Sequence, residues 1–111
     1  MQEQNSDQVV VVLCTAPPGI AHTMATRLLD KKLVACINIL PARSVYRWQG
    51  AVCDEPEDLL FMKTTRGNVH DLTKFLVDIH PYDIPEVLVV PVQDGYDRYL
   101  SWVVSEVQKK P

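Results

Sequence analysis

The chain has 111 residues, which is the size of one ordinary folded domain. Hydrophobic residues make up 47% of it and charged residues 23%, with four glycines and eight prolines, so disordered, collagen-like and disulfide-dependent proteins are excluded. A formal net charge of −3 provides no general attraction to phosphate backbones or anionic lipids, and we therefore expect neither nucleic acid nor a membrane as a partner.

The first elements follow a polar leader, which we place at residues 1–8, and residues 9–111 then form a single domain. A β-branched run over residues 8–15 is apolar on both faces, which is typical of a central strand covered on each side. After a Pro-Pro-Gly break, apolar residues recur at helical spacing over residues 20–32. This spacing predicts a helix with one apolar stripe.

Residues 34–48 and 51–65 are both extended segments, and together they predict a long hairpin. Gln49 and Gly50 form its turn, since glycine supplies the backbone freedom that a tight turn needs. This turn fixes the cross-strand pairs Tyr46 with Cys53, Arg43 with Pro56, and Pro41 with Asp58. Because proline lacks an N–H donor and both prolines lie at nearly one level of the ladder, we expect a bulge or bend there.

The second half of the chain contributes a helix, a short strand and a final helix. Apolar positions share one helical face over residues 68–79, and the prolines that follow end this helix. Residues 86–92 form a short apolar strand, and helical spacing returns over residues 96–107. The acidic group at residues 54–58, inside the hairpin, is interpreted as a solvated bend.

These elements follow one another as β, α, β, β, α, β, α, which predicts the α+β fold class. The first six match the split βαβ pattern of ferredoxin-like domains, in which helices cover one face of an antiparallel four-stranded sheet. The hairpin is long for such a sheet. Residues 35–46 alone would extend about 40 Å, whereas a domain of this size has a radius of gyration of about 13 Å. We therefore expect an overhanging hairpin that other copies shelter in a symmetric oligomer.

Three cysteines, Cys14, Cys36 and Cys53, form neither a disulfide framework nor a zinc-ligand spacing. They fit free thiols in a reducing compartment. The first eight residues contain no lysine or arginine, and no apolar helix of signal-peptide length follows them. We therefore expect a cytoplasmic protein.

Six short strings, in order between residues 9 and 102, resemble the CutA1 divalent-cation tolerance proteins. They are VVVLCTAP at 10–17, KLVAC at 32–36, YRWQG at 46–50, KTT at 63–65, HPY at 80–82 and PE at 85–86. The resemblance implies a cytoplasmic homotrimer of ferredoxin-like subunits, similar in architecture to the PII signalling proteins, in which long hairpins wrap neighbouring subunits. It also implies a role in tolerance of copper and other divalent metals.

Cys14 lies where the first strand meets the Pro17-Pro18 break, and a thiolate with an imidazole suits Cu(I) or zinc. In bacterial relatives, copper is associated with the cysteine of this string and with two adjacent histidines before Pro-Tyr. Cys14 and His80 match those positions, whereas Ile79 replaces the other histidine. Two ligands fall short of a tight site within one subunit, so we expect either weak binding of copper or another soft metal or a site shared between subunits. The alternatives are a buried structural Cys14 and a His80 that caps a helix.

A second candidate site combines aromatic and charged residues, namely Lys63, Tyr82, Glu86 and Trp48. Aromatic walls with a few fixed charges describe a small-ligand cleft, and subunit junctions are frequent places for one. This site favours an alternative function, a PII-like signalling or scaffold trimer that recognises a small ligand or a protein. The competing interpretation is an interface where Lys63 pairs with Glu86 and the aromatic residues pack against a neighbour.

Catalysis would need a nucleophile and an oriented base, and Cys14, His80 and Asp83 are the combination that the sequence offers. Spacing alone does not bring these side chains within hydrogen-bond reach. We therefore expect a non-enzymatic protein that contributes to divalent-metal tolerance.

Overall fold

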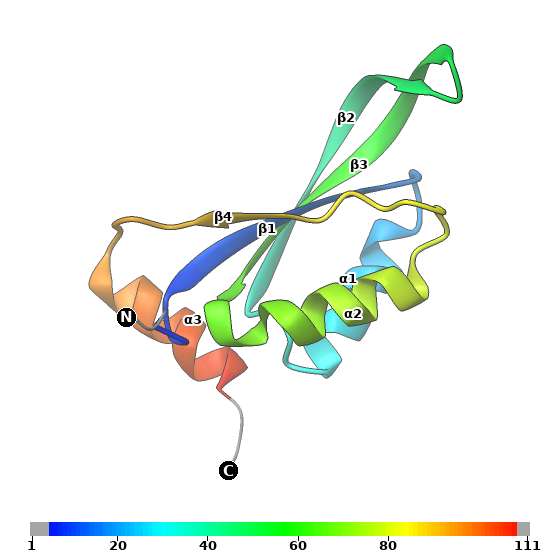
Figure 1. The fold of residues 1–111 in the computed structure, drawn as a ribbon. Coiled ribbons are helices and arrows are strands. Elements are labelled where there is room, and N and C mark those ends of the chain that lie inside the picture. Colours follow the sequence, from blue (N-terminus) through cyan, green and yellow to red (C-terminus); the bar gives the residue numbers. More distant parts are fainter. Residues whose placement is uncertain (1–4, 109–111) are drawn as a thin grey trace.

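The computed structural model describes residues 5–108 and has the expected α+β architecture (Figure 1). In chain order the elements are β1 (Val9–Ala16), α1 (Ala21–Asp30), β2 (Cys36–Trp48), β3 (Ala51–Thr65), α2 (Val69–Ile79), β4 (Leu88–Pro91) and α3 (Asp97–Val107). A short 3₁₀ turn, Arg66–Asn68, leads into α2. Every predicted helix and strand is therefore confirmed, with small differences at the ends. No helix in the described range has both the length and the hydropathy needed to cross a membrane.

The four strands form one antiparallel sheet in the order β2-β3-β1-β4, so the ferredoxin-like prediction is confirmed. Strand β1 lies between β3 and β4. Along it, Val10, Val12 and Cys14 are fully buried, whereas Val11 and Leu13 on the other face are only half-buried. The expectation of a strand covered on both faces is therefore wrong for a single chain, because α1 and α2 cover only one of them.

The hydrophobic core lies between the sheet and the helices, which are below the strands in Figure 1. Helical spacing places Met24 and Leu28 of α1, and Leu72 and Leu76 of α2, on the faces turned to the sheet. They pack with Val10, Val12, Cys14, Leu60 and Met62 of β1 and β3. Helix α3 contacts β3 and β1, and the carbonyl oxygen of Val107 accepts a 3.2 Å hydrogen bond from the buried Asn68 side chain.

The β2–β3 hairpin projects beyond the rest of the sheet. Strand β1 pairs with β3 only as far as Ala16 and Asp58, whereas β2 and β3 stay paired up to Trp48 and Ala51. We call the two-stranded part, residues 42–57, the arm (Figure 1). It contributes to a radius of gyration of 14.9 Å and a longest dimension of 45 Å. The overhang predicted from strand length is therefore confirmed.

The arm turns at Gln49 and Gly50, as predicted, with φ values of 51° and 82°. Positive φ at both central residues is the geometry of a type I′ turn, whose twist matches that of the flanking strands. The predicted pairs Tyr46–Cys53, Arg43–Pro56 and Pro41–Asp58 are all present. The hairpin register predicted from the turn is therefore confirmed.

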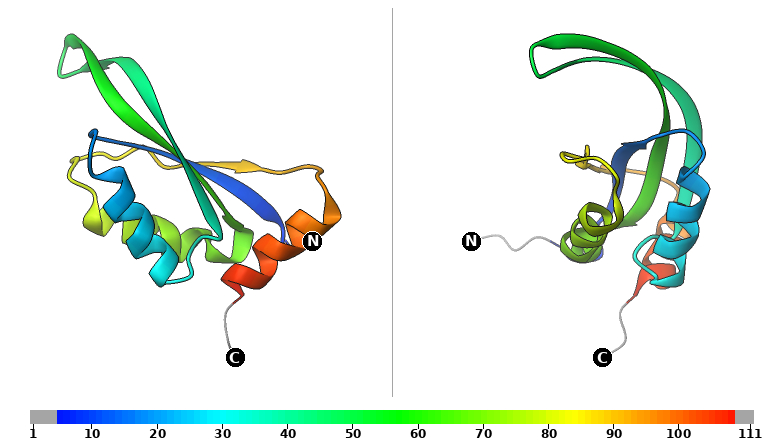
Figure 2. Two further views of the ribbon diagram at one scale, coloured as in Figure 1. Left: turned by 180° about the vertical axis from the view of Figure 1, so that it is seen from behind. Right: turned by 90° about the vertical axis from the view of Figure 1, so that its right-hand side faces the viewer.

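The prolines of the hairpin do not interrupt this register, so the predicted bulge is wrong. Pro41 lies in the edge strand β2, and Pro56 lies beyond the end of β1. Each strand thus has one unpaired side at its proline, where a missing N–H costs no ladder hydrogen bond. The bend is present instead as a gradual curve of the arm, which carries its tip over the segment that follows α2 (Figure 2).

The described part of the predicted leader, residues 5–8, hydrogen-bonds to the turn before α2. The backbone amide of Gly67 donates to the carbonyl of Ser6, and that of Arg66 donates to the carbonyl of Gln8, both at 2.8 Å. Residues 1–4 and 109–111, which belong to the predicted leader and domain end, lie outside the described residues.

Candidate functional site

A cavity of about 600 Å³ lies between the arm and the segment that joins α2 to β4. We call it the arm cleft. Its walls come from the end of β1, from the arm and from the joining segment: Thr15, Ser44, Val45, Tyr46, Trp48, Glu57, Pro81, Tyr82, Asp83, Ile84 and Glu86. No lysine or arginine of the described chain lines it.

Strand alternation brings most of the sheet residues of the arm cleft, with the exception of Val45, to one face. Paired residues in an antiparallel sheet project to the same side, and neighbours along a strand project to opposite sides. Cys14 points into the core, so Thr15 and its partner Leu59 point away from the helices. Glu57, two residues before Leu59, lies on the same face. Its partner in β2 is Ala42, and Tyr46, four residues after Ala42, therefore also lies on this face.

The other wall begins where α2 ends. His80 has an extended backbone, with φ −76° and ψ 137°, and Pro81 and Pro85 then disfavour a return to helix. The segment therefore runs across the end of β1 and beneath the curved arm (Figure 2). This course brings Tyr82 next to β3.

Two tyrosine–glutamate hydrogen bonds organise the arm cleft. The hydroxyl of Tyr82 donates to Glu57 Oε2 at 2.5 Å, and that of Tyr46 donates to Glu55 Oε1 at 2.6 Å. Burial and the Glu57 hydrogen bond raise the pKa of Tyr82, while the Glu55 hydrogen bond is the main cause that raises the pKa of Tyr46 to about 12. Both phenols therefore stay protonated and donate at neutral pH.

Three of the four residues predicted for a ligand cleft line the arm cleft, namely Trp48, Tyr82 and Glu86. Lys63 does not. It lies near the other end of β3, opposite Cys36, with its Nζ 4.0 Å from the Cys36 sulfur. Lys63 and Glu86 form no ion pair with each other in the described chain.

The predicted metal ligands Cys14 and His80 both lie within hydrogen-bond distance of the carbonyl oxygen of Thr15. The Cys14 thiol donates to this oxygen at 3.6 Å, and His80 Nε2 lies 2.7 Å from it. The backbone amide of Tyr82 donates to His80 Nδ1 at 3.0 Å, which fixes the ring proton on Nε2. Both ring nitrogens of the buried His80 are thus engaged.

The surroundings of Cys14 favour the neutral thiol. Burial, followed by the negative charges of Glu86 and Glu57, raises its pKa from 9.0 to about 12. A thiolate is the form that attacks electrophiles and binds soft metals, and little of it is present at neutral pH. The thiol donates to Thr15 rather than to His80, so the described chain contains no thiol–imidazole pair. Nor does it contain a cluster of three or more potential metal ligands.

The burial of Glu57 was not predicted from the sequence. Its acidic neighbourhood was expected to be a solvated bend, but Glu57 is only 7% exposed, although Asp54 and Glu55 are exposed. The strand period places Glu57 on the face of Leu59, but Glu55 shares that face and is exposed. The burial of Glu57 therefore depends on its contact with Tyr82, a tertiary contact that the strand pattern does not contain.

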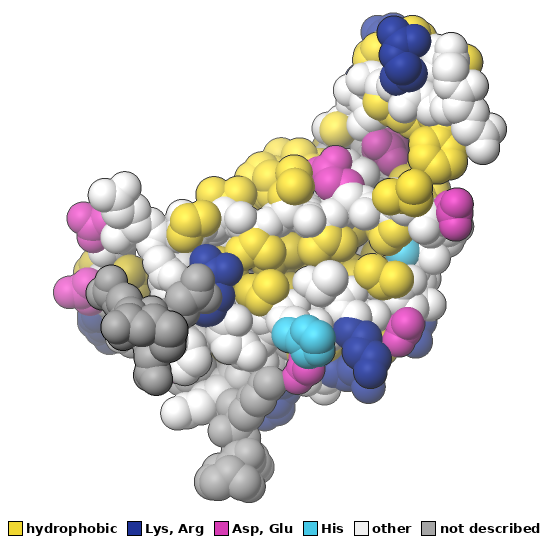
Figure 3. Space-filling view, in the orientation of Figure 1, with side chains coloured by type: hydrophobic (Ala, Val, Ile, Leu, Met, Phe, Trp, Pro, Cys, Tyr) yellow, Lys and Arg dark blue, Asp and Glu magenta, His cyan; other side chains and the backbone are white. Residues whose placement is uncertain are grey.

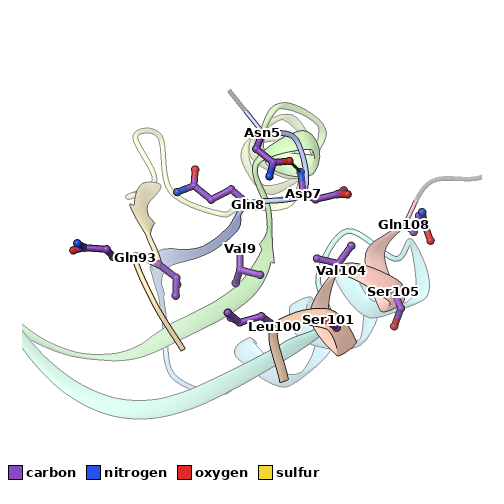
Figure 4. A pocket seen from close by; sticks show the side chains of 11 residues that line it. Asn5, Asp7, Gln8, Val9, Gln93, Leu100, Ser101, Val104, Ser105 and Gln108 are labelled. Carbon is purple, nitrogen blue, oxygen red and sulfur yellow. Dashed lines mark hydrogen bonds between the residues drawn. The ribbon is translucent and has the colours of Figure 1, made fainter. Parts of the chain in front are cut away.

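A second, more open groove of about 880 Å³ lies between the N-terminal segment, the end of β4 and α3 (Figure 4). Among the described residues that line it, Asp7 alone is charged, and most of the polar groups are amides and hydroxyls from Asn5, Gln8, Gln93, Ser101, Ser105 and Gln108. It contains none of the predicted metal or ligand residues. The arm cleft is therefore the better candidate site.

Comparisons with known proteins agree with this architecture. The family model described as CutA1 divalent ion tolerance protein matches residues 10–106. The divalent-cation tolerance protein CutA of Citrobacter koseri is 42% identical over 109 residues, covering 96% of this chain and 95% of the relative.

Two solved structures are also similar to this chain. The PII-like protein CutA from Nostoc sp. PCC 7120, in apo form, has a TM-score of 0.85 and 32% identity, with 89% of this chain and 97% of that chain covered. The periplasmic divalent cation tolerance protein CutA from Archaeoglobus fulgidus has a TM-score of 0.87 and 30% identity, with 90% and 99% covered. The sequence and the fold thus lead to one conclusion: the chain belongs to the CutA1 family of divalent ion tolerance proteins.

Proposed function

We propose that this protein serves divalent-cation tolerance as a non-enzymatic homotrimer whose arm cleft binds a small ligand. The observation that carries the proposal is the arm cleft itself, which gathers Trp48, Tyr82 and Glu86 from two segments that are distant in the sequence. Its volume of about 600 Å³ falls in the range of small-molecule sites, which combine mostly apolar walls with a few placed polar groups.

The homotrimer is supported by the apolar surface that one chain leaves uncovered. On the arm, Val45 is 63% and Val52 66% exposed, and on β4 Leu88 is 54% exposed. A band of hydrophobic side chains runs across the molecule and onto the arm (Figure 3). Apolar surface along an unpaired strand edge favours cover by another chain. Three arms around a common axis provide this cover and bring the arm clefts to the subunit junctions.

The absence of catalysis is supported by the high pKa of Cys14 and by the engagement of both nitrogens of His80. We propose a cytoplasmic location because Cys14, Cys36 and Cys53 are free thiols in the structure, as a reducing compartment favours. Fractionation of cells that produce the untagged protein tests this location, and recovery with periplasmic markers would contradict it.

Thermal unfolding tests the ligand function. A ligand that binds only the folded protein raises the Tm as its concentration rises. We expect at least one member of a panel of small cationic, neutral and anionic metabolites to raise the Tm of the wild type but not that of Trp48→Ala. Trp102→Ala is the matched control, because Trp102 is 42% and Trp48 39% exposed, and Trp102 lies outside the arm cleft. An unchanged wild-type Tm across the panel contradicts the proposal.

A second candidate function is weak binding of copper or another soft metal by Cys14 and His80. The specific observation in its favour is that both side chains meet at the carbonyl oxygen of Thr15. A metal there would have to displace the thiol proton and free a ring nitrogen of His80, and both steps oppose binding. The expected affinity is therefore low.

Titration with Cu(I) under reducing conditions, in competition with a chelator, tests this second function. Cys14→Ala is expected to abolish the binding, and Cys53→Ala, which removes a half-buried thiol of the arm, is the control. Ile79→His restores the paired histidines implied by the family resemblance and is expected to tighten binding. Equal binding by the wild type and Cys14→Ala rules out this site.

A further inference from the structure

The charge of the arm cleft is the first indication of what it binds. Three carboxylates line it, those of Glu57, Asp83 and Glu86, and no lysine or arginine of the described chain accompanies them. The ion pair Arg43–Asp54 lies on the exposed arm and involves none of the three. Within a single chain, the arm cleft is therefore an anionic cavity without a countercharge.

The lack of a countercharge matters most at Glu57, because this residue is buried. Its side chain belongs to a residue that is 7% exposed, and the partner of its carboxylate is the neutral hydroxyl of Tyr82. One hydrogen bond from a neutral hydroxyl does not replace the hydration that a carboxylate loses on burial, and a nearby cation offsets that loss. A cation in the arm cleft would supply this missing charge.

The aromatic walls of the arm cleft favour an organic cation. Tyr46, Trp48 and Tyr82 all line it. Aromatic faces attract ammonium groups and also bury the carbon atoms attached to them. A bare divalent ion would instead need several close oxygen or nitrogen ligands, and the described residues contain no cluster of three or more that could hold one. A cavity of about 600 Å³ also has room for a carbon skeleton.

We propose that the arm cleft binds an organic ammonium ion, with its charged group at Glu57 and Glu86 and its apolar body against Tyr46, Trp48 and Tyr82. This inference rests on the proposed function, that the arm cleft binds a small ligand, and adds the chemical class of that ligand.

The test compares three probes of nearly equal shape by isothermal titration calorimetry. Choline carries the quaternary ammonium group, dimethylbutanol has carbon in place of the charged nitrogen, and dimethylbutanoate is an anion. We expect choline to bind at least about tenfold more tightly than the other two, which corresponds to about 1.4 kcal/mol. Choline affinity should also fall as salt is added, since salt screens the attraction of partly exposed charges.

Variants that remove one negative charge each test whether Glu57 and Glu86 attract the ammonium group. Glu57→Gln and Glu86→Gln are each expected to weaken choline binding severalfold, and Glu106→Gln, which removes an exposed negative charge on α3, is expected to leave it unchanged. Glu86 is exposed, so its variant remains informative if Glu57→Gln folds poorly. Choline binding that survives Glu57→Gln and Glu86→Gln alike overturns the proposal.

The outcomes separate this inference from the proposed function. Tighter binding of dimethylbutanol or dimethylbutanoate, lost in Trp48→Ala, overturns the ammonium class but supports a ligand site in the arm cleft. If none of the three probes binds, the ammonium class is overturned, and the metabolite panel decides the proposed function independently.

Discussion

The hydroxyl of Tyr82 donates a 2.5 Å hydrogen bond to Glu57 and so joins the segment after α2 to the base of the arm. The two residues are 25 positions apart in the chain. This bond closes one side of the arm cleft and gives the buried carboxylate of Glu57 its partner. It therefore serves both the fold and the candidate site.

Tyr82→Phe is expected to lower the free energy of unfolding by about 1 to 3 kcal/mol, because it leaves the Glu57 carboxylate buried without its hydrogen-bond donor. Tyr46→Phe removes the corresponding bond to Glu55, which is exposed, and is expected to have a much smaller effect. Urea unfolding followed by circular dichroism measures both. Equal losses would show that the burial of Glu57 has no energetic consequence.

Leu76→Ala is expected to destabilise the protein by about 2 to 5 kcal/mol, because it opens a cavity beneath the sheet. Leu76 is fully buried between α2 and the sheet, whereas its neighbour Val77 is 50% exposed. Val77→Ala should therefore change the stability by less than about 1 kcal/mol. The urea midpoints of the two variants test this difference, and similar midpoints would contradict the assignment of the buried face.

Alkaline pH is expected to destabilise the protein. The pKa of Cys14 is raised from 9.0 to about 12, so between these values the unfolded chain releases a proton that the folded chain retains. The free energy of unfolding therefore falls as the pH rises above about 9. The raised pKa values of Tyr46 and Tyr82 act in the same direction at higher pH.

The contribution of Cys14 can be isolated by Cys14→Ala, whose stability should decline less steeply than that of the wild type between about pH 8 and 10. Urea unfolding in a reducing buffer measures the slope, which is independent of any constant loss from the smaller side chain. Parallel pH profiles would show that the thiol does not ionise on unfolding in this range.

Val45→Lys and Val52→Lys together are expected to convert the proposed trimer into smaller species, because both side chains lie on the arm and are more than 60% exposed in a single chain. Lysine costs little at such a site when the chain is alone, but it places unpaired charges in a contact between subunits. Analytical ultracentrifugation measures the mass. Val77→Lys on α2 is the control and should remain trimeric.

Much of the fold could be predicted from local patterns. The hairpin register followed from Gln49 and Gly50, because the turn alone fixes which residues are paired. The helices followed from their apolar spacing. The covering of both faces of β1 could not be predicted correctly for a single chain, since an apolar run does not distinguish a helix of the same chain from a neighbouring subunit.

The candidate site was less predictable than the fold. Trp48, Tyr82 and Glu86 were identified because aromatic and charged residues flank a turn and a proline segment, but Lys63 was grouped with them without knowledge of the chain's path. The engagement of His80 by Thr15 and Tyr82 depends on backbone atoms, which leave no trace in the residue types. Tertiary contacts of this kind are beyond sequence patterns.

The uninterrupted pairing from Cys36–Lys63 to Trp48–Ala51 restricts how the arm can change in length. One residue inserted into each strand below Tyr46 would turn the rings of Tyr46 and Trp48 to the opposite side of the sheet. Two residues inserted into each strand would restore their direction but move them outward by about 7 Å. Insertions beyond Trp48 would leave these rings where they are, so the hairpin tip is the place where length variation is compatible with an intact site.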